Sequence, residues 1–396
     1  MRRGLCSPPR WTVRPTLTAS DLDWDWVDMK FAIRDTYRPQ GCRGGVGWYT
    51  LWLAEALSRE LGGLDVFTQE PEAFPNCRAV QDGTGFAGAG WSRGLALLRK
   101  VANPVRMMNA YDGVILPHPQ EPAVRIAAGI QVLVVHDLIP LAQPDRSIKG
   151  RMYGAFYRRL LPMSMRRVDR IVVPSHCTKS DLLDRFELAP EKVQVIPNGF
   201  NARLTTMARG LAAGAWSPQG VPRDYLIYVG NATPHKNLRR LVQALSLVRA
   251  HLDVGLVLVG TAEPDWYRGL ASVLGLAGGV AFLGHLSDAD LAKVLRHARA
   301  LVQPSLHEGF GMPPLEAMAV GVPVAASNIS SLPEVCGQAA LYFDPYDVPG
   351  MATTLERILV DETVRLGCTD EGLRQAARFG WDITARKFKD MVTGVV

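Results

Sequence analysis

The sequence predicts an α/β protein built from two Rossmann-like domains. Its 396 residues exceed what one ordinary hydrophobic core accommodates, so two domains are the default expectation. Short β-branched runs alternate along the chain with longer helical segments, which is typical of parallel sheets with helical crossovers. The clearest unit spans 300–345, where a buried strand, a Gly-rich turn, a helix from Leu315 to Val320 and a second strand from Val322 to Ser327 follow one another.

The composition is that of a globular protein, with 47% apolar and 21% charged residues and a net charge of +6. This mild basic excess suits anionic small ligands or an anionic membrane surface, and we expect no nucleic-acid partner. No apolar run approaches the roughly 18 residues that span a bilayer. The cysteines are scattered without metal-ligand spacing, which indicates a reduced, cytoplasmic setting. They are Cys6, Cys42, Cys77, Cys177, Cys336 and Cys368.

Residues 1–28 differ from the rest of the chain, and we interpret them as a disordered extension or as a start assigned too far upstream of Met29. Arg2 and Arg3 precede no apolar segment, so a twin-arginine signal is not expected. Three alternating acids in this extension form a formal Asp-x-Asp pattern, but no buried strand precedes them. We therefore assign no metal site here; the acids are Asp21, Asp23 and Asp25.

In the first domain, a strand at Phe31–Ile33 is followed by a loop and then by a Gly-rich turn that contains Gly45 and Gly47 and opens a helix. Such a turn brings backbone N–H groups close to phosphate, although a tight turn without a ligand has the same pattern. Farther on, the β-branched strand at 130–135 ends at His136. Ligands of open α/β sheets bind at such carboxyl ends, but a lone histidine also serves for packing or capping.

The stretch 146–170 is strongly basic, with arginines and a lysine interleaved with Met, Tyr, Phe and Leu. Two interpretations remain open. The helix either lies on an anionic membrane surface and brings the protein to a lipid-linked partner, or it is an ordinary surface helix whose aromatic side chains pack inward.

In the second domain, a strand at Tyr225–Val229 leads into a turn in which Lys236 precedes a helix at Leu238–Val248. There the ammonium group is well placed to neutralise a diphosphate, although an isolated surface lysine would have the same local sequence. Asp288 and Asp290 occupy the first turn of a later helix, where capping accounts for them.

The turn His307–Gly311 and the helix after it contain the strongest chemical signal. Backbone N–H groups of Gly309, Phe310 and Gly311, together with the helix dipole, favour an anionic phosphate. Glu308 sits just before this turn, and Glu316 follows eight residues later near the start of the helix. The two glutamates would suit a sugar ring and a ribose diol, or they are a solvated loop acid and an ordinary helix charge.

The string PSLHEGFGMPPLEAMAVGVPVAAS, with SLPEV, AALYFDP and the earlier VLVVHDLIPL, resembles the family-4 retaining glycosyltransferases of the GT-B fold, in particular bacterial polysaccharide mannosyltransferases. The resemblance implies two Rossmann-like domains facing across a cleft. It places an acceptor-side domain at 29–204, a linker at 205–223, a donor-side domain at 224–380 and a final helix at 381–396 that crosses back to the first domain.

The same resemblance implies site roles. Glu308 and His136 are the expected catalytic residues, and the donor contacts fall on the residues of the three Gly- or Lys-containing turns and the following helix: Gly45, Gly47, Lys236, Gly309, Phe310, Gly311, Leu315 and Glu316. Family members often carry arginine where this chain has Asn231 and His235, so phosphate charge compensation is expected to rest more heavily on Lys236.

The expected function is transfer, with retention and without metal or cofactor, of a sugar from a nucleotide sugar, with GDP-mannose as the favoured donor. The acceptor would be a hydroxyl of a glycan or lipid-linked saccharide in cell-surface polysaccharide synthesis, such as that of lipopolysaccharide, in the cytoplasm or at the inner face of the membrane. Two alternatives remain. One is a catalytically weak GT-B protein that binds a nucleotide sugar or glycan, and the other is a sugar-diphosphate epimerase or phosphorylase on a similar fold.

Overall fold

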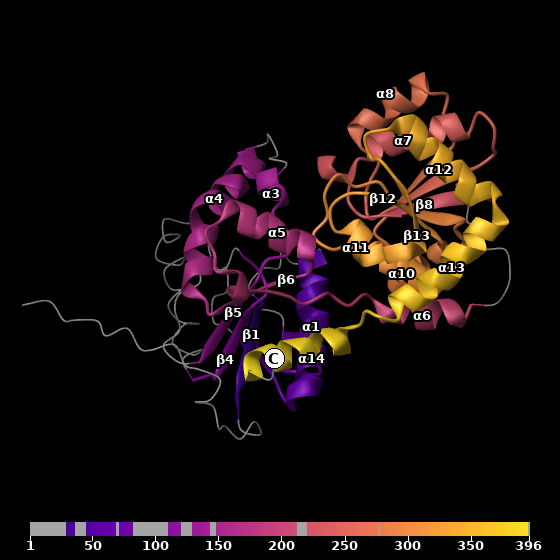
Figure 1. Cartoon of the computed structure of the whole chain (residues 1–396). Helices are drawn as coiled ribbons and strands as arrows, with labels where there is room; N and C mark the ends of the chain where they lie inside the picture. The colour runs from indigo at the N-terminus through magenta and orange to yellow at the C-terminus, as the bar shows by residue number, and fades with distance from the viewer. Residues whose placement is uncertain are drawn as a thin grey trace, which may run out of the picture.

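The computed structural model describes residues 29–35, 45–68, 71–81, 110–119, 129–142, 148–211, 220–276 and 278–394. These residues form two α/β domains, each with a parallel sheet between helices (Figure 1). The predicted two-domain α/β architecture is therefore confirmed. The extension 1–28 with its three aspartates, and the loop after β1, lie outside the described residues.

The first domain is organised around a parallel sheet in the order β3-β2-β1-β4-β5-β6-β7. Its inner strands are short, largely apolar runs buried on both faces, as parallel strands covered by helices must be, whereas the edge strand β3 begins with the exposed Arg78. The strands are β1 (Phe31–Asp35), β2 (Asp65–Thr68), β3 (Arg78–Gln81), β4 (Gly113–Leu116), β5 (Ile130–Val134), β6 (Arg170–Val173) and β7 (Val193–Val195). The helices are α1 (Gly45–Leu61), α3 (Ile139–Ala142), α4 (Ile148–Arg167) and α5 (His176–Arg185), with short 3-10 turns at Pro71–Ala73 and Pro190–Lys192.

The second domain repeats this plan with the order β10-β9-β8-β11-β12-β13. Its strands are β8 (Tyr225–Val229), β9 (Gly255–Val259), β10 (Val280–Gly284), β11 (Ala300–Gln303), β12 (Val324–Ser327) and β13 (Ala340–Phe343). Its helices are α6 (Ala202–Arg209), α7 (Leu238–Val248), α8 (Asp265–Val273), α9 (Asp288–His297), α10 (Met312–Val320), α11 (Leu332–Cys336), α12 (Val348–Val360) and α13 (Glu362–Ala376), with 3-10 turns at Pro234–Lys236 and Gly337–Ala339. In both sheets the strand order reverses direction beside the first strand, which creates a ligand crevice at the carboxyl ends of the strands.

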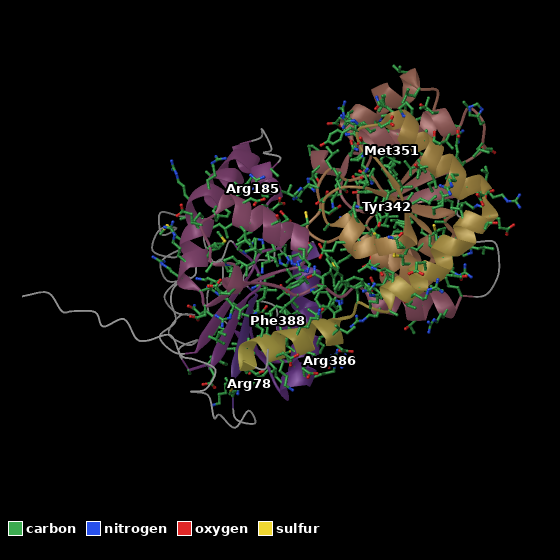
Figure 2. The ribbon with its side chains drawn as sticks, viewed as in Figure 1. Arg78, Arg185, Tyr342, Met351, Arg386 and Phe388 are labelled. Atoms are coloured by element: carbon green, nitrogen blue, oxygen red, sulfur yellow. The ribbon has the colours of Figure 1, made fainter. Side chains whose placement is uncertain are left out.

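The last helix, α14 (Trp381–Thr393), packs on α1 of the first domain, as predicted (Figure 1). Phe388 on α14 is fully buried in the first domain's core (Figure 2). The ring of Trp381 contacts those of Tyr49 and Trp52 on α1. The Thr384 hydroxyl donates to the Pro197 carbonyl at 2.7 Å. The first described strand, β1, and the last described helix, α14, therefore lie in the same domain.

The chain passes between the domains twice, and the two crossings lie against each other. A Cβ on Gly199, in the first crossing, would overlap the backbone N and the ring of Trp381, in the second. The absence of a side chain at Gly199 is what allows this approach. The helix α6 that follows packs on α9 and α10 of the second domain, so the predicted boundary at residue 204 falls inside a helix of that domain rather than at the start of a linker.

The basic stretch predicted at 146–170 contains the helix α4, in which Arg166 and Arg167 of the last turn are exposed. Tyr157 and Leu161 are buried, whereas Leu160 and Met163 are 49% and 45% exposed. Arg158 and Arg159 are also exposed. The helix thus buries one side and presents a mixed cationic and apolar face to solvent.

Candidate active site

The site is organised where the order of the second sheet reverses, between β8 and β11. The connection after β8 carries Lys236, and the connection after β11 carries Glu308. Because parallel strands end at the same edge of a sheet, these two connections meet. The Lys236 ammonium contacts the two carboxylate oxygens of Glu308 at 2.7 and 2.9 Å, with both side chains largely shielded from solvent.

Glu308 is held as a carboxylate by several donors. Its Oε1 accepts hydrogen bonds from Gln303 Nε2 and from the Ser305 hydroxyl, each at 2.7 Å, in addition to the Lys236 contact. Burial by itself would raise the pKa of Glu308, but Lys236 and the Ser305 hydrogen bond outweigh burial and lower the pKa below its ordinary value. Oε2 accepts from Lys236 alone among the described residues. The arrangement fixes the carboxylate and keeps it ionised.

The backbone around Glu308 is also fixed. Ser330, on the connection after β12, both accepts from the Glu308 N–H and donates to the Glu308 carbonyl. The Ser331 hydroxyl lies within hydrogen-bond distance of the Glu308 and Phe310 carbonyls. This network was not predicted from the sequence, although polar residues shortly after a buried parallel strand are a signal that could have found it.

The two glycines of the following turn are required for different reasons. Gly311 has φ of +105° and serves as the N-cap of α10, a left-handed conformation that favours glycine. Gly309 has no such φ, but a Cβ there would overlap the His136 carbonyl oxygen of the first domain. Gly309 therefore marks the point where the two domains touch next to the predicted catalytic residues.

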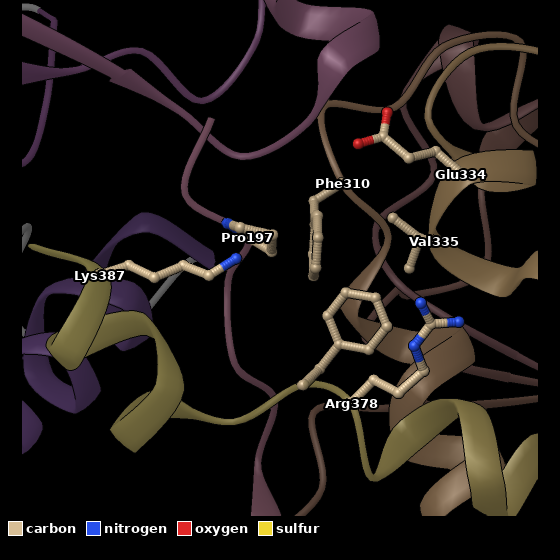
Figure 3. Close-up of a pocket in the computed structure, with 7 residues that line it drawn as sticks. Pro197, Phe310, Glu334, Val335, Arg378 and Lys387 are labelled. Carbon is tan, nitrogen blue, oxygen red and sulfur yellow. The ribbon is translucent and has the colours of Figure 1, made fainter. Parts of the chain in front are cut away.

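Phe310 is buried, and its ring packs edge-to-face on Phe379 at 5.7 Å between centroids. The two rings border a cavity of about 200 Å³ near the domain crossings. Figure 3 shows Phe310 between Pro197 and Val335, with Lys387 extending toward Pro197. The side chain of Phe310 thus faces the crossings, so only its backbone is left to contact a donor.

The helix α10 places its two predicted donor contacts differently. Leu315 is fully buried in the second domain's core, which leaves only its backbone to face a ligand. Glu316 is 8% exposed, and its Oε1 accepts from the Asn201 N–H at 3.4 Å. Burial raises the pKa of Glu316 to about 7, partly offset by that hydrogen bond.

In the first domain, His136 follows β5 and lies against α1. Its Nε2 is 2.8 Å from the Pro117 carbonyl, so this nitrogen carries the proton. Burial lowers the pKa of His136 to about 4, so the imidazole is neutral at pH 7. Tyr49, two residues after Gly47, packs its ring edge on that of His136. The start of α1, where Gly45 and Gly47 lie, is therefore beside the carboxyl end of β5.

The two positions that depart from the family pattern supply no positive charge. Asn231 Oδ1 accepts from the N–H and hydroxyl of Thr233, forming a local turn. Burial and the nearby Lys236 lower the pKa of His235 to about 4, so it is neutral. Among these three neighbouring positions, the cation is Lys236. Within the described part of the chain, no group of three or more His, Cys, Asp or Glu side chains is arranged to hold a metal ion.

Two twisted parallel sheets that face each other, a C-terminal helix that returns to the first domain and a buried Lys–Glu pair at the second switch point define a GT-B protein. Comparison with known families identifies which group of GT-B proteins the chain belongs to. Residues 43–204 match the model for "Glycosyltransferase Family 4", and residues 218–376 match the model for "Glycosyl transferases group 1". The chain belongs to the family-4 glycosyltransferases.

Among its curated relatives, O-antigen chain mannosyltransferase B of Escherichia coli is 30% identical over 372 residues, an alignment that covers 85% of this chain and 93% of the relative. The serotype-specific mannosyltransferase WbdA of E. coli is 31% identical over 262 residues, which is 64% of this chain and 32% of WbdA. The chain therefore spans about a third of the length of WbdA.

Solved structures share the fold. Sucrose-phosphate synthase of Thermosynechococcus elongatus superimposes with a TM-score of 0.74 at 20% identity, covering 93% of this chain and 99% of that chain. WaaG, a glycosyltransferase involved in lipopolysaccharide biosynthesis, gives 0.68 at 19% identity and covers 92% and 100%. At these identities the likeness concerns the fold alone.

Proposed function

We propose that this protein transfers mannose from GDP-mannose, with retention of anomeric configuration and without a metal ion or other cofactor, to a hydroxyl of a glycan or lipid-linked saccharide in cell-surface polysaccharide synthesis. The observation that carries the proposal is the buried Lys236–Glu308 pair in front of the N-terminus of α10. The choice of mannose is supported by the curated relatives, several of which are named as mannosyltransferases.

The proposed roles follow from charge and position. The donor's diphosphate is anionic, so Lys236 and the N–H groups at Gly309–Gly311 and the start of α10 stabilise it as charge builds up on the leaving group. Lys236 then turns from Glu308 to the phosphate. Glu308 remains ionised because Gln303 and Ser305 still donate to it, and its carboxylate stabilises positive charge that develops on the sugar ring. Neutral His136 orients the sugar from the first domain, and closure of the domains excludes water.

The first experiment is a thermal-shift screen of the protein with GDP, UDP, ADP and dTDP, each with and without EDTA. A ligand that binds only the folded state raises the midpoint by mass action. We expect GDP to raise it most, with no change on adding EDTA. A preference for another nucleotide overturns the assignment of GDP-mannose as the donor. A shift that EDTA abolishes overturns the proposed independence of a metal ion. The absence of any shift favours a degenerate site.

Two variants then separate binding from turnover. Glu316→Ala is expected to weaken nucleotide binding, and Glu308→Ala to reduce turnover while nucleotide affinity stays near that of the wild type. Full activity of both variants contradicts the proposed site. Release of free mannose or of a sugar phosphate without any acceptor product favours a hydrolytic, epimerase or phosphorylase reaction instead.

We further propose that α4 contacts an anionic membrane surface and brings the site to a lipid-linked acceptor. The outward arginines together with exposed Leu160 and Met163 support this, because interfacial helices combine cations with apolar side chains. No helix in the described part of the chain is long and apolar enough to cross a membrane.

A further inference from the structure

We propose that Ser175 and Thr178, at the start of α5 in the first domain, are positioning residues that orient the Gly309–Phe310 peptide for the donor when the domains close. This rests on the proposed function, since the same turn would bind the donor diphosphate. Neither residue stands out in the sequence as a site residue, because each lies more than 130 positions from the turn.

The contacts are direct and buried. The Ser175 hydroxyl lies 2.8 Å and the Thr178 hydroxyl 3.1 Å from the Gly309 carbonyl oxygen, and the two side chains are 0% and 2% exposed. Two hydroxyls of the first domain thus hold one carbonyl of the second. Gly309 also lies close to the His136 carbonyl, so first-domain backbone as well as these hydroxyls surrounds this residue.

Capping of α5 does not account for both hydroxyls. Ser175 caps the helix by accepting from the Thr178 N–H at 3.1 Å, which requires only its oxygen. A threonine hydroxyl inside a helix ordinarily bonds to a carbonyl of its own helix or to water. The Thr178 hydroxyl lies 3.0 Å from the capping Ser175 hydroxyl and also reaches across the domain interface to the Gly309 carbonyl, a contact that capping does not require.

The neighbouring contacts make the start of α5 the docking point of the second domain. Glu334 of α11 accepts from the N–H groups of His176 and Cys177 at 2.9 and 3.2 Å, which satisfies the remaining donors of the first turn. Asp181, farther along α5, lies 3.2 Å from His307, directly before Glu308. A separation of the domains would break these contacts together.

The consequence for the donor follows from peptide geometry. In a trans peptide the N–H points opposite to the C=O. With the Gly309 carbonyl held on α5, the Phe310 N–H points away from α5. The described chain contains no cis peptide. Domain closure therefore sets the direction of one of the N–H groups proposed to bind the diphosphate, and an open form leaves that peptide free to rotate.

The decisive variants keep the shape of the side chain and remove the hydroxyl that donates a hydrogen bond to Gly309. Thr178→Val is nearly isosteric but loses the hydroxyl, and Thr178→Ser retains it. The double variant Ser175→Ala/Thr178→Val removes both hydroxyl groups that donate hydrogen bonds to the Gly309 carbonyl. Because Ser175→Ala also removes a helix cap, Asp361→Ala serves as a matched control, since Asp361 caps α13 far from the turn by accepting from the Val364 N–H.

Three readouts apply to the purified full chain: the midpoint of thermal unfolding, the Kd for GDP and UDP by calorimetry, and the ratio of GDP-mannose hydrolysis to transfer onto a synthetic alkyl mannoside. For the double variant we expect the Kd of the bound nucleotide to rise about tenfold, and hydrolysis to gain on transfer because an open cleft admits water. Thr178→Val should show part of this effect. Thr178→Ser and Asp361→Ala should keep the wild-type Kd and ratio.

A double variant that unfolds at a lower temperature but keeps the wild-type Kd and ratio has lost only stability, and this result overturns the positioning role. Small-angle scattering without ligand gives an independent test, because the double variant should be more extended than the wild type and Asp361→Ala. If the wild type binds no nucleotide, the proposed function falls, and scattering alone decides whether these hydroxyls hold the domains together.

Discussion

At the residue scale, Gly309 is the position where the smallest possible change has the largest expected effect. We expect Gly309→Ala to reduce kcat/KM by about 100-fold or more, because its Cβ would overlap the His136 carbonyl. Both clashing groups are fixed to the backbone, so neither can move aside without shifting the chain. Steady-state kinetics and small-angle scattering check this. Gly269→Ala in α8 is the control, because a Cβ there meets nothing within 4 Å. Wild-type activity of Gly309→Ala would show that the domains do not meet here.

Glu316 predicts a pH dependence of stability. Its pKa is about 7 in the folded protein against an ordinary value of 4.5, so the folded state binds an extra proton between these values. The stabilising effect of this proton is fully present below pH 4.5 and is lost as the pH rises through 7. The free energy of unfolding of Glu316→Gln, measured relative to the wild type, should therefore increase by up to about 3 kcal/mol between pH 5 and pH 8.

Denaturant unfolding at the two pH values measures this difference. Glu187→Gln, which removes an exposed carboxylate, is the control. Its stability relative to the wild type should change little between the two pH values. An unchanged difference between wild type and Glu316→Gln across this range would mean that the Glu316 carboxyl is not buried as described.

The sequence allows candidate site residues to be named, but it does not identify their partners. Gly309, Gly311 and Glu308 are recognisable because turn chemistry and spacing are local properties. The Lys236–Glu308 pair follows from two strand ends that meet at one sheet edge. The hydroxyls that reach Gly309, and the Asn201 N–H that bonds Glu316, come from elements brought together only by domain docking, for which no local pattern exists.

At the element scale, α14 is expected to stabilise the first domain although it follows the second in sequence. Phe388→Ala should cost about 3–5 kcal/mol, because the ring is fully buried against α1. Hydrogen exchange should show faster exchange in α1 and little change in α12. Leu355→Ala, a fully buried residue of α12, should show the reverse pattern. Equal exchange changes in α12 for both variants would contradict this assignment.

The helix α14 was predictable because its start follows Gly380 and its apolar side chains recur with helical spacing. That spacing does not identify the helix on which α14 packs. The return of α14 to the first domain was predicted from the resemblance to GT-B proteins. The difference at α6 has a similar origin. The stretch after residue 204 looks like a linker in composition, but Leu204 packs in the second core, and residues 205–209 continue the helix α6 of that domain.

At the scale of the whole molecule, the outward face of α4 predicts salt-sensitive binding to anionic vesicles. Cosedimentation should be strong with phosphatidylglycerol vesicles, weak with phosphatidylcholine, and reduced by raising the salt concentration. Leu160→Asp/Met163→Asp should weaken it severalfold. Leu247→Asp is the control, because Leu247 is similarly exposed on α7 of the other domain. Equal binding by both variants would show that α4 is not the contact surface.

The return of α14 to α1 also orders the events of biosynthesis. A ribosome delivers the first domain's sheet early but releases its last structural helix only after the whole second domain. Until then Trp52, Leu53 and Leu57 on α1 lack their cover, and the second domain is already complete through α13. The domain made first is thus finished last. Nascent chains would need protection at α1, and truncations that remove α14 would damage the first domain rather than the second domain, which directly precedes α14 in the chain.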